Sequence, residues 1–173
     1  LGSDKIWQLG LNKTKAWTTH DSISEKPGNG PRHSVIVATG LKNAAFVKTQ
    51  SITPPDSDPS APFAAAELLY AESPTPLLYA SNRNDPHPEG DAITVLETTP
   101  KLKPVAYVRT GLNYIRGMEF VGPKKEYVIA AGMNGGGIKV FKRVPAKLGY
   151  LSEVAHLPNG TIAQPSSFLW VNW

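Results

Sequence analysis

The chain has 173 residues, 40% of them hydrophobic, and a formal net charge of +4 at pH 7. This length suits one ordinary domain with a hydrophobic core, and no stretch approaches the roughly 20 apolar residues that span a bilayer. The chain has no cysteine, which excludes disulfides, thiolate metal sites and cysteine nucleophiles. Sixteen prolines and 15 glycines, with few long periodic runs, favour many short strands over helices.

The N-terminal third predicts four short strands separated by loops. Alternating or β-branched runs mark the strands, and segments 21–30 and 51–62 are rich in turn residues. The predicted strands are 4–9, 16–19, 34–38 and 45–49.

From residue 64 onward the pattern repeats in units of four strands. The first unit predicts strands 64–70, 77–83, 92–97 and 104–109. The second predicts strands 114–120, 127–132, 137–141 and 151–157, with a Gly-rich hairpin loop at 133–137, and 167–171 begins a further unit. Glu67 and Arg116 occupy equivalent positions 49 residues apart, which suits one blade of a β-propeller.

We therefore expect an all-β fold, a β-propeller of which this chain forms about three to four blades. A single blade cannot bury both of its faces, so blades must stack around an axis. We expect one partial propeller domain over 1–173, with a blade end at 1–27, blades at 28–62, 63–110 and 111–162, and a closing strand at 163–173.

One interval does not fit this repeat. His33 and Glu67 are only 34 residues apart, about 15 fewer than the repeat requires. Either the blade at 28–62 is truncated, or the sequence joins segments across a gap near 34–38. We favour the gap.

Four polar residues are candidates for a shared site. His33, Glu67 and Arg116 stand at the start of first strands, and Arg83 ends a second strand directly after Ser81 and Asn82. The starts of inner strands meet near a propeller's channel, where two arginines suit carboxylate or phosphate recognition. A histidine or glutamate beside them suits proton transfer. The alternatives are an arginine that ties loop carbonyls, a solvent-facing Glu67 and a surface His33.

No cofactor is expected, and no two histidines have metal-ligand spacing. We interpret the net positive charge first as a solvated basic surface and second as an affinity for anionic small molecules. Nucleic acid is disfavoured because no aromatic residues accompany the basic ones, and no membrane partner is expected. Sequons at Asn12 and Asn159 slightly favour an extracellular over a cytoplasmic location.

Four segments in order give this chain a family resemblance: Gly30-Pro31-Arg32-His33, Ala65-Ala66-Glu67, Leu78-Tyr79-Ala80-Ser81-Asn82-Arg83 and Ile115-Arg116-Gly117-Met118. The chain resembles the seven-bladed lactonase propellers, a family that includes 6-phosphogluconolactonase and 3-carboxy-cis,cis-muconate lactonizing enzyme (carboxymuconate cyclase). Residues 133–141 are similar to the fungal cyclase branch. The resemblance covers about the C-terminal half of the ring.

The resemblance implies that His33, Glu67, Arg83 and Arg116 line the channel of a metal-free lactonase or lactonizing enzyme with an anionic substrate. It also implies that a second chain or fragment, such as a proteolytic partner, supplies the remaining blades. The alternative is a catalytically inactive, secreted propeller that binds carbohydrate or protein. A generic protein-interaction propeller is less favoured, because the Gly-His and Trp-Asp signature is missing.

Overall fold

The computed structural model describes residues 5–11, 14, 17–24, 51–72, 74–144 and 147–171. The chain divides into two compact units, Leu1–Thr49 and Gln50–Trp173. In the first unit β1 (Lys5–Leu11) and β2 (Trp17–Ser24) pair as an antiparallel hairpin, and both strands run further than predicted. His33, the strands expected at 34–38 and 45–49 and the suspected gap lie outside the described residues.

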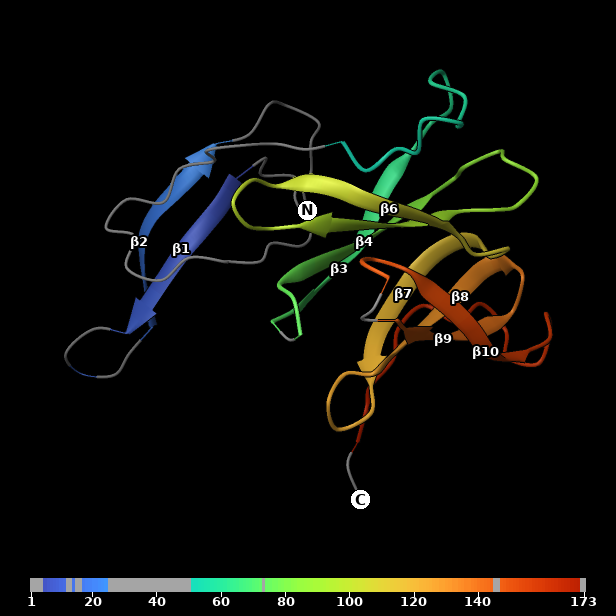
Figure 1. Ribbon diagram of the computed structural model, residues 1–173. Helices are drawn as coiled ribbons and strands as arrows, with labels where there is room; N and C mark the ends of the chain where they lie inside the picture. The colour runs from blue at the N-terminus through green and yellow to red at the C-terminus, as the bar shows by residue number, and fades with distance from the viewer. Residues whose placement is uncertain are drawn as a thin grey trace. The chain divides into compact units, whose positions relative to one another are not determined.

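The second unit contains two four-stranded antiparallel sheets, in which each strand pairs with the next one in sequence (Figure 1). The first sheet consists of β3 (Ala64–Ala71), β4 (Leu77–Arg83), β5 (Ala92–Glu97) and β6 (Lys103–Arg109). The second consists of β7 (Asn113–Val121), β8 (Tyr127–Gly135), β9 (Ile138–Arg143) and β10 (Leu151–Leu157). The described residues contain no helix, so none that could cross a membrane.

Burial follows position in the sheet. All seven residues of β4 are buried, as expected for a central strand that is covered on both faces. Five of the seven residues of β10, at the edge of its sheet, are exposed. The two sheets meet where β3 and β4 contact β7. An all-β meander of four strands, repeated and stacked face to face, is the arrangement of propeller blades, and it confirms the predicted partial propeller.

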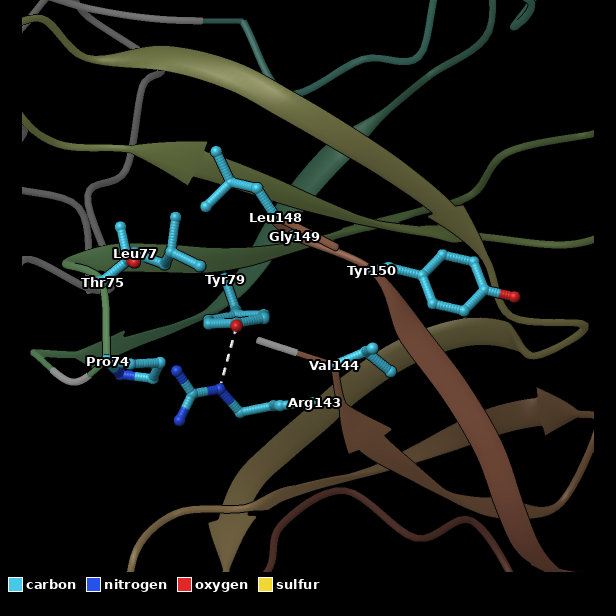
Figure 2. Close-up of a pocket in the computed structure, with 9 residues that line it drawn as sticks. All are labelled: Pro74, Thr75, Leu77, Tyr79, Arg143, Val144, Leu148, Gly149 and Tyr150. Atoms are coloured by element: carbon cyan, nitrogen blue, oxygen red, sulfur yellow. Dashed lines mark hydrogen bonds between the residues drawn. The ribbon is translucent and has the colours of Figure 1, made fainter. Parts of the chain in front are cut away.

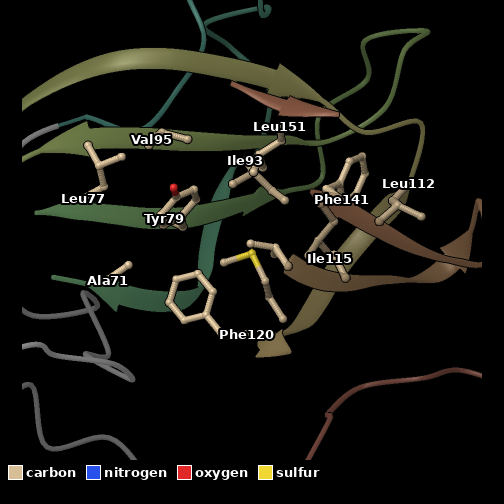
Figure 3. Packing of buried hydrophobic residues seen from close by; sticks show 13 residues of the cluster. Ala71, Leu77, Tyr79, Ile93, Val95, Leu112, Ile115, Phe120, Phe141 and Leu151 are labelled. Carbon is tan, nitrogen blue, oxygen red and sulfur yellow. The ribbon is translucent and has the colours of Figure 1, made fainter. Parts of the chain in front are cut away.

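The hydrophobic core lies between the two sheets (Figure 3). Ile93 and Val95 from the first sheet and Val128 from the second are fully buried. Tyr79 and Phe120 pack edge to face across the interface, with their ring centroids 5.5 Å apart. Burying apolar side chains of this size contributes about 1.5–3 kcal/mol each, so this interface holds the blades together.

The structure corrects two of the predicted strands. The strand expected to end at Gly132 continues to Gly135, and this extension pairs with β7. The pairing of β8 with β9 ends at Ala131 and Ile138, and the Gly132 N–H donates to the Gly137 carbonyl, so the hairpin loop is 133–136, within the predicted 133–137. Gly136 and Gly137 have φ of 83° and 74°, a backbone conformation that favours glycine. The strand expected at 167–171 is not formed in the described part of the chain, because these residues have no partner strand there.

Candidate functional site

Of the predicted site residues, Arg83 ends its strand, and Glu67 and Arg116 are each the fourth residue of the first strand of their sheets. The antiparallel register pairs Ala64, at the start of β3, with Arg83 at the end of β4. It likewise pairs Asn113, at the start of β7, with Gly135 at the end of β8. Arg83 and Tyr114 are in contact, so these ends of the two sheets meet. Arg83 therefore lies at this junction, and Glu67 and Arg116 lie three residues along the two first strands, β3 and β7, that begin there.

Glu67 lies within an irregularity of β3. The pairing of β3 with β4 shifts register between Ala65 and Leu68, and the backbone N–H of Glu67 donates a 3.0 Å hydrogen bond to Ser81 Oγ. Ser81 is fully buried, and Glu67 is half-buried. A β-bulge turns a side chain out of the regular alternation and is common beside active sites. The bulge thus gives Glu67 an orientation that strand alternation alone would not.

The start of β7 is irregular in the same way. Its register with β8 shifts between Asn113 and Ile115 and again between Ile115 and Gly117. Tyr114 and Arg116 fall inside these two shifts, and Arg116 is exposed. Irregularities therefore occur in both first strands at the residues that the sequence predicted for the site.

Arg83 is a buried cation with no ionic partner among the described residues. It retains only 8% of its exposure, and its Nε is buried without a hydrogen-bond partner. The charged group instead lies over the Tyr114 ring, with Cζ 5.0 Å from the ring centroid. A guanidinium has five N–H donors, and burial of an unpaired charge is costly. An anionic ligand is the partner that this arrangement fits.

The residues on either side of Arg83 are firmly held. Asn82 Oδ1 accepts a 2.7 Å hydrogen bond from the backbone N–H of Ala92, and Asn84 Nδ2 donates to the Pro62 carbonyl. Asp85 is buried and accepts hydrogen bonds from Ser57 Oγ at 2.6 Å and from the His87 backbone N–H at 3.0 Å. The backbone around Arg83 is fixed while its guanidinium is left without a polar partner in the described structure.

Arg109, which ends β6, is an arginine with a structural role and contrasts with Arg83. Its guanidinium pairs with Asp85 and with Asp56 and also donates to Ser57 Oγ and the Gly90 carbonyl. This network fastens the loop before β3 to the first sheet. Sequence reasoning missed it, because nothing in the local pattern relates Asp56 to a residue 53 positions away.

Two buried aspartates have pKa values displaced in opposite directions. Burial alone would raise the pKa of Asp85, but hydrogen bonds from Ser57 and Arg109 hold it below its ordinary value. Burial raises the pKa of Asp91, although the backbone N–H groups of Asp85 and Ile115 donate to its carboxylate. Among the residues that the structure describes, no cluster of acidic, histidine or cysteine side chains could hold a metal ion.

A shallow pocket lies at the opposite end of β4 (Figure 2). Its polar feature is Arg143, whose Nε donates a 2.9 Å hydrogen bond to Tyr79 Oη and whose Nη1 donates to the Lys125 carbonyl. The guanidinium also stacks on the Tyr79 and Phe120 rings, at 5.4 Å from each centroid. Because these donors form hydrogen bonds within the protein, we interpret this pocket as a structural contact between the two sheets and call it the seam pocket.

No protein-family model matches the sequence. A curated protein of Arthroderma benhamiae, named "Probable 6-phosphogluconolactonase", is 29% identical over an alignment length of 171, and the match covers 84% of this chain and 43% of that protein. A crystal structure of a Lactobacillus plantarum protein superposes with a TM-score of 0.54 at 17% identity, covering 95% of this chain and 38% of the other. The chain thus spans less than half the length of both proteins.

Proposed function

We infer, from a partial β-propeller whose sequence is similar to that of a probable 6-phosphogluconolactonase, that the full-length protein hydrolyses an anionic lactone. The observation that carries this proposal is Arg83, a buried guanidinium without an ionic partner among the described residues, at the junction where the strands of Glu67 and Arg116 begin. A site with two arginines and an acid suits an anionic substrate that reacts through proton transfer.

Each residue has a role in this proposal. Water attacks the lactone carbonyl carbon, the ring C–O bond breaks, and the departing alkoxide takes up a proton. Arg83 and Arg116 hold the substrate's anionic group and stabilise the negative charge that develops on the carbonyl oxygen. His33 is the general acid or base, and Glu67 orients it or shares the proton transfer. His33 lies outside the described residues, and its role in this proposal rests on the sequence motif alone.

Two substrates follow from the resemblance. The name of the Arthroderma benhamiae protein points to 6-phosphogluconolactone, in which a phosphate would meet the arginines. The carboxymuconate cyclase branch points instead to a lactone formed by adding a carboxylate across an activated double bond. Both are anionic lactone chemistry, so the same arginines would serve either.

The test is lactone hydrolysis and muconate cyclisation by the full-length protein. We expect hydrolysis of 6-phosphogluconolactone above the spontaneous rate, and a loss of turnover of about 10²-fold or more in His33→Ala, as for a general acid or base. His156→Ala is the matched control, since His156 lies on the outer strand β10 with its side chain 59% exposed. Near-normal turnover in His33→Ala would remove His33 from the mechanism, and no activity on either substrate would overturn the proposal.

One observation favours the alternative of a secreted binding propeller. The sequon asparagine Asn159 is exposed in the segment after β10 and is therefore accessible for glycosylation. Mass spectrometry of the protein from its native source is the test. Glycan on Asn159 together with no turnover would favour a binding protein, whereas an unmodified, active protein would exclude it.

We also propose that the blades missing from this chain are supplied by a further segment or a second chain. The chain covers 43% and 38% of the two similar proteins, and propeller blades depend on stacked neighbours for burial. Intact mass measured under native and denaturing conditions tests this. A mass accounted for by these 173 residues alone under both conditions would contradict it.

A further inference from the structure

The contact between Arg83 and Tyr114 combines three unusual features. Arg83 is 8% exposed, and its Nε has no hydrogen-bond partner in the described structure. Tyr114 has a φ of 66°, a left-handed conformation that is rare for a bulky residue. The Tyr114 ring nevertheless faces the Arg83 guanidinium, 5.0 Å from Cζ. Such backbone outliers persist only when their surroundings impose them, and they cluster at functional sites.

A single buried carboxylate imposes this geometry. Asp91 is fully buried, and its Oδ2 accepts a 2.9 Å hydrogen bond from the backbone N–H of Ile115, directly after Tyr114. Its Oδ1 accepts a 2.9 Å hydrogen bond from the backbone N–H of Asp85, two residues after Arg83. Asp91 thus ties the chain beside Arg83 to the chain beside Tyr114, although these segments belong to different sheets.

We propose that Tyr114 is a positioning residue for Arg83, whose ring supports one face of the guanidinium and leaves the in-plane N–H donors for an anionic ligand. The inference rests on the proposed anionic site and deepens it. An aromatic face attracts the cation without using its hydrogen-bond donors. A carboxylate in the place of Tyr114 would neutralise the charge and occupy those donors, as Asp85 and Asp56 do for Arg109.

The test is anion binding by the full-length protein, measured by calorimetry with inorganic phosphate and, separately, malonate. We expect Arg83→Met to abolish binding and Tyr114→Leu to weaken it roughly 3- to 30-fold, the value of a cation–π contact. Tyr114→Phe keeps the ring and should bind within about twofold of the parent. The tighter of the two probes identifies a phosphate or a carboxylate as the anionic group.

Tyr150→Leu is the matched control. Tyr150 also lies under a cation, with Lys147 Nζ 3.9 Å from the ring centroid, but it is exposed at the seam pocket. Its substitution should leave anion affinity unchanged. If Tyr114→Leu does not fold, Tyr114→Trp takes its place and should bind at least as tightly as the parent, since tryptophan offers the strongest cation–π face.

Several results would overturn the inference. They are parent-like affinity in Tyr114→Leu, equal losses in Tyr114→Leu and Tyr114→Phe, weaker binding in Tyr114→Trp, or no binding of either probe by the parent. Lactone turnover, measured on the same samples, separates this inference from the proposed function. If the parent turns over lactone but anion binding does not depend on Tyr114, only the positioning role is refuted. If anion binding depends on Tyr114 but the parent shows no lactone turnover, only the proposed lactonase function is refuted.

Discussion

Asp85→Asn is the substitution whose effect on stability follows most directly from the structure. The Asp85 side chain is fully buried and accepts hydrogen bonds from Arg109, Ser57 and the His87 backbone. Removing its charge leaves Arg109, itself only 12% exposed, with the exposed Asp56 as its remaining anion. Breaking a buried ion pair costs about 3–5 kcal/mol. Because Asp56 stays, we expect a loss of about 3 kcal/mol in the free energy of unfolding.

Urea unfolding of the full-length protein measures this loss as a lower midpoint with an unchanged slope. Asp58→Asn is the control from the same loop, because the exposed Asp58 side chain accepts hydrogen bonds only from nearby Ser60; its midpoint should not move. A loss below about 1 kcal/mol in Asp85→Asn, typical of an exposed pair, would refute the reasoning.

The same variant has a defined pH dependence. Because the pKa of Asp85 is lower in the folded protein than in the unfolded chain, its contribution is complete above the unfolded pKa of about 4. It is lost as the pH falls through the folded pKa. The stabilities of parent and Asp85→Asn should therefore differ most near neutral pH and converge in acid. The Asp85 charge is the weakest cause of the raised pKa of Asp91, so the opposite shift of Asp91 cancels largely, though not completely, between the two proteins. A pH-independent difference would contradict the assignment.

Three further predictions concern the same two sheets. Gly136→Ala should lower stability by about 1–3 kcal/mol in thermal unfolding, because φ is 83° and the added Cβ would lie 2.7 Å from Leu112 Cα; an unchanged melting temperature would contradict this. Arg143→Met should lower the free energy of unfolding in urea by about 1–3 kcal/mol, because it leaves buried hydrogen-bonding groups unpaired; an unchanged midpoint would show that Arg143 does not stabilise the contact at the seam pocket. Arg116→Met should keep the parent's melting temperature, because Arg116 is exposed, and should reduce turnover on anionic lactones; full turnover would remove Arg116 from the site.

The strands were largely predictable because their signals are local. Residues 77–80 form an apolar run just before Ser81, and the observed β4 has the predicted bounds, 77–83. The repeat of 49 residues correctly indicated stacked blades. The extension of β8 to Gly135 was missed, since glycines weaken a strand signal and the extension depends on pairing with β7.

The geometry of the candidate site was only partly predictable. The motifs named Glu67, Arg83 and Arg116, but the register shifts around Glu67 and Arg116 depend on pairing with other strands. Tyr114 gave no signal as a site residue, because its contact with Arg83 joins residues of different sheets. The difference between Arg83 and Arg109 likewise emerges only when the loop at 51–62 folds against Arg109. Such contacts are set by the tertiary fold.

The most direct test of the account is the discrimination between a charged and an uncharged lactone. The measurement is the ratio of kcat/KM for 6-phosphogluconolactone to kcat/KM for gluconolactone, in the full-length parent and in Arg83→Met. Charge-assisted hydrogen bonds contribute about 1.5–3 kcal/mol, so the ratio should fall roughly 10- to 150-fold when Arg83 is lost. An unchanged ratio would contradict the central claim that Arg83 receives the anionic group of the substrate.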